Sequence, residues 1–170
     1  DKPKMCGEYW CGWFDHWGKG HHLRPAADAG QGLLDEVEFM LASGAHFNFY
    51  MFHGGTNFGF TAGANGNRKH DYEATVTSYD YDCMLSECGD PTGKFFECQK
   101  LIRKYSDNPR IASVVPAKKV VPKPVRLTQS VPLFSQLERL GGPSGRAVTP
   151  PTMEELEENF GFIYYRKRLD

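Results

Sequence analysis

The 170-residue sequence lacks several features by which common classes of protein are recognised. No apolar run approaches the roughly 18 residues that a membrane-spanning helix needs, so no membrane contact is expected. No dense Lys/Arg stripe is present and the formal net charge is −1, so nucleic acid is excluded as an expected partner. The opening residues, DKPKMCGEYW, also lack the apolar core of a signal peptide.

The cysteines do not form a recognisable framework. They are five in number, an odd count, and include two CxxxxC pairs, Cys6/Cys11 and Cys83/Cys88. Structural zinc sites use shorter spacings and paired partners, and disulfide-rich domains usually carry an even count. Free thiols in a reducing compartment are therefore expected. Together with the missing signal they favour a cytoplasmic, bacterial location without fixing it.

The sequence gives little support for two classes of cofactor, metal ions and nucleotides. All six histidines lie within the first 70 residues, but they form no HxH or HxxxH pair. No metal is therefore predicted, and a histidine metal site is kept as an alternative that a metal analysis would exclude. The glycine-rich GGTNFG contains neither GxGxxG nor a P-loop, so no nucleotide is predicted. We expect no cofactor.

The most informative stretch that is present is Pro3–Gly18, PKMCGEYWCGWFDHWG. It holds all three tryptophans (Trp10, Trp13 and Trp17) close to the carboxylate of Glu8. Aromatic rings stack on the apolar faces of sugars, and a carboxylate stabilises an oxocarbenium-like centre. A sugar-processing site is one interpretation, and an ordinary strand with a glutamate on its solvent side is the other. This stretch alone leaves both open.

Hydrophobic periodicity predicts a βαβ unit. Residues Lys4–Tyr9 form a short apolar run typical of a strand, and helical spacing predicts a helix over residues 26–43 with Gly44 as its C-terminal cap. The nearly uncharged run at residues 45–55 predicts a strand buried on both faces, as in a parallel sheet. After a polar loop, a second helix is expected from Asp90–Pro91, with Asp90 as the N-cap, to about Tyr105.

The composition changes after this helix. Eight of the eleven prolines lie in residues 106–151, where no helical or strand period persists, so an extended connector is predicted. A helical turn is expected at Thr152–Glu155 and a β-strand at Phe162–Arg166.

Three segments, taken in order, resemble the family 35 glycoside hydrolases, which are β-galactosidases built on a TIM barrel followed by β-domains. The segments are MCGEYWCGWFDHWG, FYMFHGGTNFGFTAGAN and TSYDYDCMLSECGDPT. The resemblance implies an α/β fold, with the last two βα units of a (β/α)8 TIM barrel in residues 1–105. It also implies a proline-rich connector in residues 106–151 and the start of a β-domain in residues 152–170.

The resemblance also assigns site residues. Glu8 matches the family's nucleophile at the carboxyl end of a barrel strand, where TIM-barrel enzymes carry their catalytic groups. Trp10 matches an aromatic residue that lines the galactose pocket. Tyr81 matches a tyrosine that contacts the sugar near the nucleophile, with Tyr79 and Asp80 alongside it.

The sequence departs from the family in one respect. The family's acid/base glutamate belongs to an Asn-Glu pair, and this sequence contains no Asn-Glu dipeptide. A retaining glycosidase needs two carboxyl groups about 5–5.5 Å apart. The other glutamates considered for this role lie on predicted helix surfaces or loops: Glu36, Glu38, Glu73, Glu87 and Glu97.

Two functional hypotheses follow. The first is a retaining exo-β-galactosidase acting on terminal β-D-galactosyl residues, of which this chain is a fragment that carries the nucleophile and is inactive in isolation. The alternative is a non-catalytic remnant that binds a sugar or packs against a partner chain. The expected ligand is a β-galactoside, and the oligomeric state is not predicted.

Overall fold

A computed structural model describes the chain at residues 2–27, 30, 32–67, 70–108 and 113–169. The chain divides into two compact units, Asp1–Lys118 and Lys119–Asp170. Each unit is described by itself below. Within the described residues, no helix combines the length and the apolar character that crossing a membrane requires.

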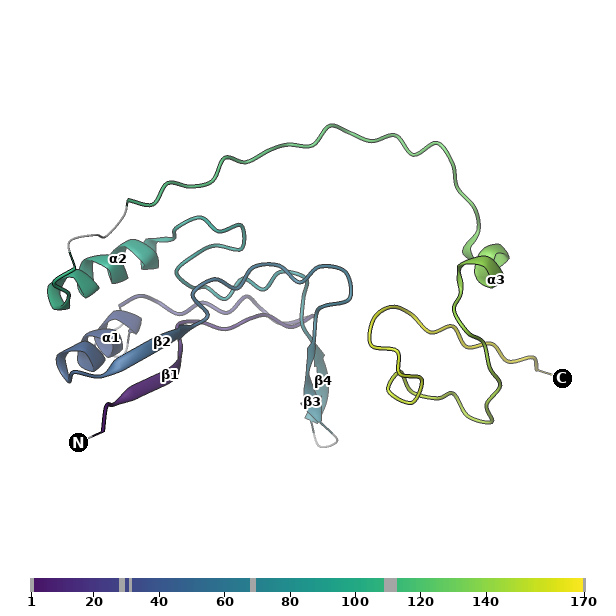
Figure 1. The fold of residues 1–170 in the computed structure, drawn as a ribbon, viewed down its shortest axis with the longest axis horizontal. Helices are drawn as coiled ribbons and strands as arrows, with labels where there is room; N and C mark the ends of the chain where they lie inside the picture. Colours follow the sequence, from purple (N-terminus) through teal and green to yellow (C-terminus); the bar gives the residue numbers. More distant parts are fainter. Residues whose placement is uncertain (1, 28–29, 31, 68–69, 109–112, 170) are drawn as a thin grey trace. The chain divides into compact units, whose positions relative to one another are not determined.

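A parallel pair of strands, joined through a helix, organises the first unit (Figure 1). Strand β1 (Met5–Trp10) pairs with β2 (His46–Tyr50), and α1 (Leu33–Ala42) lies between them in the sequence. The predicted βαβ order and the α/β class are therefore present. The register changes between Cys6 and Tyr9, so that two residues of β1 stand opposite one residue of β2. This bulge contains Glu8.

Helix α1 is shorter at its start than the sequence indicated. It begins at Leu33 instead of residue 26, because Gly30 has a φ of +86° and Gly32 is extended, with a ψ of 165°. The Asp35 carboxylate accepts a hydrogen bond from the Gly32 N–H at 3.2 Å, which fixes the first turn. The C-terminal prediction is confirmed, since Gly44 follows the helix with a φ of +67°.

The prediction that the second strand is buried on both faces is wrong for this chain. No residue of β2 is fully buried, and His46 and Asn48 are exposed. Phe47 and Phe49 are half-buried because both rings pack against Tyr9 of β1. On the opposite face only Tyr50, at the end of the strand, is half-buried, where its ring contacts Tyr81.

A hairpin occupies part of the region that was predicted to be a polar loop. Strands β3 (Ala64–Asn67) and β4 (His70–Ala74) pair antiparallel, and their connection lies outside the described residues. Neither strand has the apolar alternation by which strands are recognised in a sequence. Cross-strand pairing and a hydrogen bond from the Thr75 N–H to the Gly63 carbonyl hold the hairpin instead.

The second helix, α2 (Gly93–Ile102), is followed by the 3-10 turn η1 (Arg103–Tyr105). The prediction of Asp90 as its N-cap is wrong. Thr92 is the cap, and its hydroxyl oxygen accepts a hydrogen bond from the Phe95 N–H at 3.4 Å. Pro91 forms a β-bridge with Leu85 and so lies outside the helix.

The core of the first unit lies between the sheet, the two helices and the loops that follow the strands. Its buried residues are Tyr9, Cys11, Phe14, Leu33, Val37, Tyr81, Cys83, Met84, Cys98 and Leu101. Three of these, Cys11, Phe14 and Tyr81, follow the carboxyl end of β1 or lie in the SYDYD segment (residues 78–82). The core therefore extends into the loop that follows the first strand.

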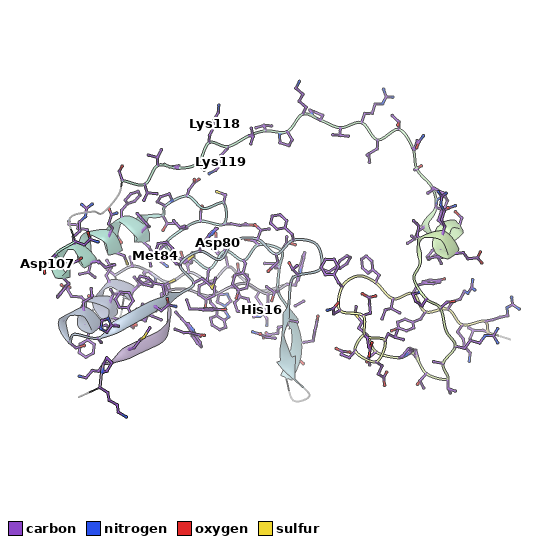
Figure 2. The ribbon with its side chains drawn as sticks, in the orientation of Figure 1. His16, Asp80, Met84, Asp107, Lys118 and Lys119 are labelled. Carbon is purple, nitrogen blue, oxygen red and sulfur yellow. The ribbon has the colours of Figure 1, made fainter. Side chains whose placement is uncertain are left out.

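The second unit has little regular structure. A 3-10 turn, η2 (Leu133–Gln136), and the short helix α3 (Leu137–Leu140) interrupt the region that was predicted to have none. Lys118 and Lys119 project from an extended stretch at the boundary of the units (Figure 2).

The C-terminal predictions have opposite outcomes. The turn after Thr152 is confirmed, because the Thr152 N–H donates to Glu155 Oε2 at 2.8 Å and the Glu155 N–H donates to Thr152 Oγ1 at 3.2 Å. The strand predicted at residues 162–166 is wrong, because the structure forms no strand over these described residues.

Candidate active site

The Glu8 side chain is presented by a distortion of its strand. Because Glu8 lies in the β1 bulge, its orientation differs from that of a residue in a regular strand, and the side chain is exposed. The indole N–H of Trp10 donates a hydrogen bond to Glu8 Oε2 at 3.2 Å. The carboxylate is therefore oriented through one oxygen.

The SYDYD segment lies directly against the loops that follow β1 and β2. A Cβ atom at Gly12 would collide with the Tyr81 carbonyl, and one at Gly54 would collide with the Tyr79 carbonyl. Since the carboxyl ends of two parallel strands meet at one edge of a sheet, both glycines bring this segment to the edge that carries Glu8. Glycine is required at both positions by these backbone contacts.

Contacts between aromatic rings, two tilted and two stacked, connect the predicted site residues. Trp10 contacts Trp13 at 5.0 Å between ring centroids, and Trp13 contacts Tyr81 at 5.9 Å. Phe14 stacks on Tyr79 at 5.0 Å, and Tyr79 stacks on Tyr81 at 5.9 Å. Glu8, Trp10, Tyr79 and Tyr81 thus belong to one continuous cluster, although they come from opposite ends of the first unit's sequence.

Tyr81 is the most constrained member of this cluster. Its side chain is 0% exposed, and within the described part of the chain its hydroxyl has no hydrogen-bond partner. Burial raises the pKa of Tyr81, and the nearby Tyr79, Cys11, Tyr50 and Glu8 raise it further. The hydroxyl therefore stays protonated and is available to donate to a group that enters the site.

Tyr79 is held by a different contact. Burial and a hydrogen bond with the Tyr50 side chain raise the pKa of Tyr79 to about 12. Because Tyr50 is the last residue of β2, this bond attaches the SYDYD segment to the second strand.

A buried ammonium, Lys94 Nζ, fixes the end of the segment. It donates to the Asp82 carboxylate at 2.7 Å, to the Asp82 carbonyl at 2.5 Å and to the Cys11 carbonyl at 3.2 Å. Asp82 also accepts from the Arg24 N–H at 2.6 Å and has a φ of +49°. Lys94 is not among the site residues predicted from the sequence. Its signal is a lysine in the buried stripe of α2, one turn before Cys98.

Glu87 connects the two loops at the edge of the site. Its carboxylate accepts hydrogen bonds from the hydroxyls of Thr56 and Ser78, each at 2.6 Å. His53 Nε2 lies 3.0 Å from the Glu87 carbonyl oxygen. The bonds from Ser78 and Thr56 hold the pKa of Glu87 below its usual value. Glu87 is therefore an ionised clamp between HGGTN and SYDYD, which makes it unsuitable as a proton donor.

Replacing Glu87 with Gln is expected to lower the free energy of unfolding by about 1.5 kcal/mol, because the charge that accepts both hydroxyl bonds is lost. The folded-state pKa lies below the usual 4.5, so the wild-type advantage is full above pH 4.5 and disappears as the pH falls through the lowered value. Urea unfolding at pH 7 and at acidic pH measures this difference. Glu97→Gln, on the exposed face of α2, is the matched control; equal effects of the two substitutions at pH 7 contradict the clamp.

Three of the four other glutamates considered as acids form ion pairs. Glu36 Oε1 lies 2.8 Å from Arg24, Glu38 lies 3.3 Å from Lys104, and Glu73 lies 3.8 Å from Lys19. For Glu36, burial raises the pKa, but hydrogen bonds from Arg24 and Tyr9 outweigh it and lower the pKa overall. These glutamates are engaged in structural contacts away from Glu8.

Asp15 holds two of the histidines. Its carboxylate oxygens lie 2.6 Å from His21 Nδ1 and 2.9 Å from His22 Nδ1. The hydrogen bond with Asp15 raises the pKa of His21. Within the described residues, no group of three or more His, Cys, Asp or Glu side chains is arranged to hold a metal ion.

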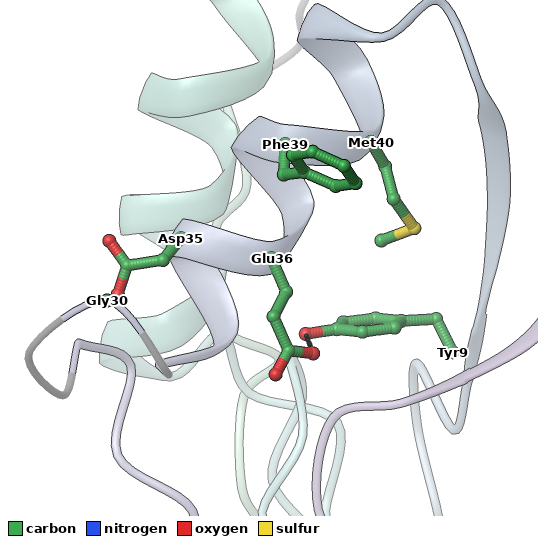
Figure 3. Close-up of a pocket in the computed structure, with 6 residues that line it drawn as sticks. All are labelled: Tyr9, Gly30, Asp35, Glu36, Phe39 and Met40. Atoms are coloured by element: carbon green, nitrogen blue, oxygen red, sulfur yellow. Dashed lines mark hydrogen bonds between the residues drawn. The ribbon is translucent and has the colours of Figure 1, made fainter.

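A surface pocket of about 400 Å³ lies between α1 and β1. Figure 3 shows that Tyr9 and Glu36 meet there, where the tyrosine hydroxyl donates to Glu36 Oε2 at 2.8 Å. Its lining includes neither Glu8 nor the SYDYD tyrosines. The pocket is therefore separate from the candidate site.

Comparison with known proteins decides the family. The family model described as "Glycosyl hydrolases family 35" matches residues 1–105. The chain belongs to this family. The resemblance inferred from the three sequence segments is thus confirmed.

Similar proteins match the chain beyond residue 105 as well. The chain is 40% identical over 177 residues to human beta-galactosidase-1-like protein 3, covering 99% of this chain and 26% of that protein. It is 41% identical to a beta-galactosidase of Xanthomonas manihotis, covering 99% of this chain and 27% of that protein. Human beta-galactosidase is 34% identical, covering 98% of this chain and 24% of that protein. The chain spans about a quarter of the length of these relatives.

Proposed function

We propose that this chain is part of the catalytic domain of a retaining exo-β-galactosidase, which hydrolyses terminal β-D-galactosyl residues. The observation that carries the proposal is the Glu8 carboxylate, exposed in a bulge at the carboxyl end of β1 and oriented by Trp10. Family membership and the names of relatives called beta-galactosidases support the same substrate. Both chemical roles are filled by carboxyl groups, so the reaction needs no cofactor.

In this proposal Glu8 is the nucleophile. The Trp10 N–H holds Oε2, which leaves Oε1 to attack the anomeric carbon and form the galactosyl-enzyme intermediate. Water then releases galactose with net retention of configuration. Trp10 offers an indole face to the sugar, since it is 51% exposed.

Tyr81 and Tyr79 are the proposed polar contacts of the sugar. The Tyr81 hydroxyl is protonated and, within the described residues, has no protein acceptor. The charge of Glu8 also contributes to the raised pKa of Tyr81. A protonated hydroxyl near this carboxylate can donate a hydrogen bond to the nucleophile or to a ring hydroxyl of the sugar. The Tyr50 contact holds Tyr79 beside it.

The proposed architecture is the last two βα units of a TIM barrel. Strands β1 and β2 are parallel and neighbouring, each is followed by a helix, and the candidate site lies at their carboxyl edge, as in TIM-barrel enzymes. Residues 106–151 are the proposed connector, and residues 152–170 the proposed start of a β-domain.

The acid/base carboxyl group is proposed to come from chain outside these 170 residues. We therefore expect the isolated 170-residue chain to hydrolyse an aryl β-galactoside far more slowly than the full-length protein. The reason is that no Asn-Glu pair is present and that the other glutamates of the first unit are ion-paired (Glu36, Glu38 and Glu73), clamped (Glu87) or exposed on α2 (Glu97). Parallel assays at equal molar concentration measure the ratio. Comparable turnover by the two proteins contradicts this division of the catalytic groups.

The substrate is tested with the full-length protein and a panel of aryl glycosides. The proposal expects hydrolysis of the β-galactoside, little hydrolysis of the β-glucosaminide and α-galactoside, and β-galactose as the first product by NMR. Preference for another glycoside overturns the substrate, and α-galactose as first product overturns the retaining mechanism.

The missing Asn-Glu pair also favours a second candidate, a non-catalytic sugar-binding protein. Titration of the full-length protein with galactose, together with the hydrolysis assay, separates the two. Saturable binding without turnover supports this alternative.

A further inference from the structure

Two buried thiols lie next to each other beneath the candidate site. Cys11 is 0% exposed and Cys83 is 1% exposed, and the Cys83 side chain raises the pKa of Cys11 while the Cys11 side chain lowers the pKa of Cys83. Cys11 Sγ also lies 2.9 Å from the Met51 carbonyl oxygen, and Cys83 Sγ lies 3.2 Å from that of Leu85. Both are free cysteines in this structure. They are separated by most of the first unit's sequence, so this contact exists only in the folded chain.

The backbones that carry the two thiols are held together independently of the sulfur atoms. Lys94 Nζ donates to the carbonyls of both Cys11 and Asp82, which is the residue before Cys83. Next to Cys11, Gly12 is in direct backbone contact with Tyr81. A disulfide needs Cα atoms roughly 4.4–6.8 Å apart, so the two backbone segments must lie side by side, and these contacts hold them side by side.

We propose that Cys11 and Cys83 form a disulfide when the chain folds in the presence of a small-molecule disulfide. The bond joins the segment that carries Glu8 to the segment that carries Tyr79 and Tyr81. It thereby adds a covalent link to the loops that the Lys94 ammonium and the two glycine contacts already hold.

The reaction is an ordinary thiol–disulfide exchange. A Cys83 thiolate attacks one sulfur of the oxidant and releases one thiol, and the Cys11 thiolate then displaces the second thiol from the mixed disulfide. Two protons and two electrons leave the cysteines, and the oxidant is reduced to two thiols. Either cysteine can react first with the same product.

Burial determines when this exchange happens. Because neither sulfur is exposed, the exchange takes place before the segments close, and the finished bond is then protected from reductants. The other cysteines differ in their surroundings. Cys88 is exposed beside Ser86 and Asp90, and Cys98 is buried in α2, where burial raises its pKa to about 11.

The test is disulfide mapping of the full-length protein after refolding in a glutathione redox buffer. Acid quenching and alkylation precede trypsin digestion under non-reducing conditions. The tryptic peptide 5–19 contains Cys6 and Cys11, and the peptide 70–94 contains Cys83 and Cys88. We expect these two peptides to be linked, and chymotryptic cleavage after Tyr9 and Trp10 to leave the link on Cys11.

Four single alanine variants, two tests and two matched controls, check the assignment. Cys11→Ala and Cys83→Ala are expected to abolish the linked product, whereas Cys6→Ala and Cys88→Ala, the nearest neighbours in sequence, are expected to retain it. We also expect reduction of the wild-type protein to lower the midpoint of thermal unfolding by about 5 °C, since the bond closes a long loop.

Each outcome decides the proposal. Complete alkylation of all cysteines after oxidative refolding overturns it, as does a link through Cys6, Cys88 or Cys98. The wild-type linkage map stands even where a variant does not fold, because it assigns the bond from fragment masses alone.

Discussion

Glu8→Gln in the full-length protein is expected to lower kcat for an aryl β-galactoside by several orders of magnitude, with little change in the free energy of unfolding. The amide cannot serve as the nucleophile, so the galactosyl-enzyme intermediate does not form. Stability is preserved because Glu8 is exposed and the Gln carbonyl can still accept the hydrogen bond from Trp10.

The matched control is Glu38→Gln, which replaces a half-buried glutamate of α1 that pairs with Lys104 of η1 and is expected to leave kcat unchanged. A 2-fluoro galactoside that accumulates the intermediate provides a second measurement. It should label the tryptic peptide 5–19 in the wild-type protein and not in the Glu8 variant. Retention of most activity by Glu8→Gln, or labelling of a different peptide, means that another residue is the nucleophile.

Lys94→Met is expected to destabilise the first unit by about 3 kcal/mol. Methionine has a similar length but no donor, so the Asp82 carbonyl and the Cys11 carbonyl lose their ammonium, and the partly buried Asp82 carboxylate loses its countercharge. Removing one partner of a buried pair costs more than the pair itself contributes, because the remaining charge stays desolvated. Urea unfolding of the full-length protein, followed by the fluorescence of the tryptophans near Glu8, measures the loss.

Lys100→Met is the control for this substitution. Lys100 lies on the same helix but is exposed, and its replacement is expected to change the free energy of unfolding by less than about 0.5 kcal/mol. If both variants unfold at the same urea concentration as the wild type, Lys94 does not carry the role assigned to it. Of the two variants, only Lys94→Met should also reduce the rate of aryl β-galactoside hydrolysis. The reason is that the loss of the ammonium frees the end of the SYDYD segment, which Gly12 and Gly54 contact.

Short-range features of the sequence anticipated the main elements. The apolar run at Lys4–Tyr9 and the helical spacing before Gly44 predicted strand, helix and strand in the observed order. These predictions succeed because side-chain periodicity and the glycine at the helix end act within one or two turns of chain. The family was likewise readable from three contiguous segments, and the match to residues 1–105 agrees with it.

Contacts between distant residues were not readable in this way. The Thr56 hydroxyl that donates to Glu87 is 31 residues away in sequence, and the Cys11 carbonyl that accepts from Lys94 is 83 residues away. The Cys11 thiol beneath the site likewise comes from the loop after β1, far in sequence from Cys83. The helix that was expected to begin at Asp90 begins after Thr92, because Pro91 bridges to Leu85 instead. In each case the partner is chosen by tertiary packing, which no local pattern encodes.

The stretch around Glu8 shows the same division. Its residue types already indicated a carboxylate among aromatic rings, since composition and spacing are properties of the sequence alone. The bulge that presents Glu8, the indole bond to Oε2 and the buried Tyr81 hydroxyl depend on β2 and on the SYDYD segment. Strand register and burial are relations between segments, so they exist only once the chain has folded.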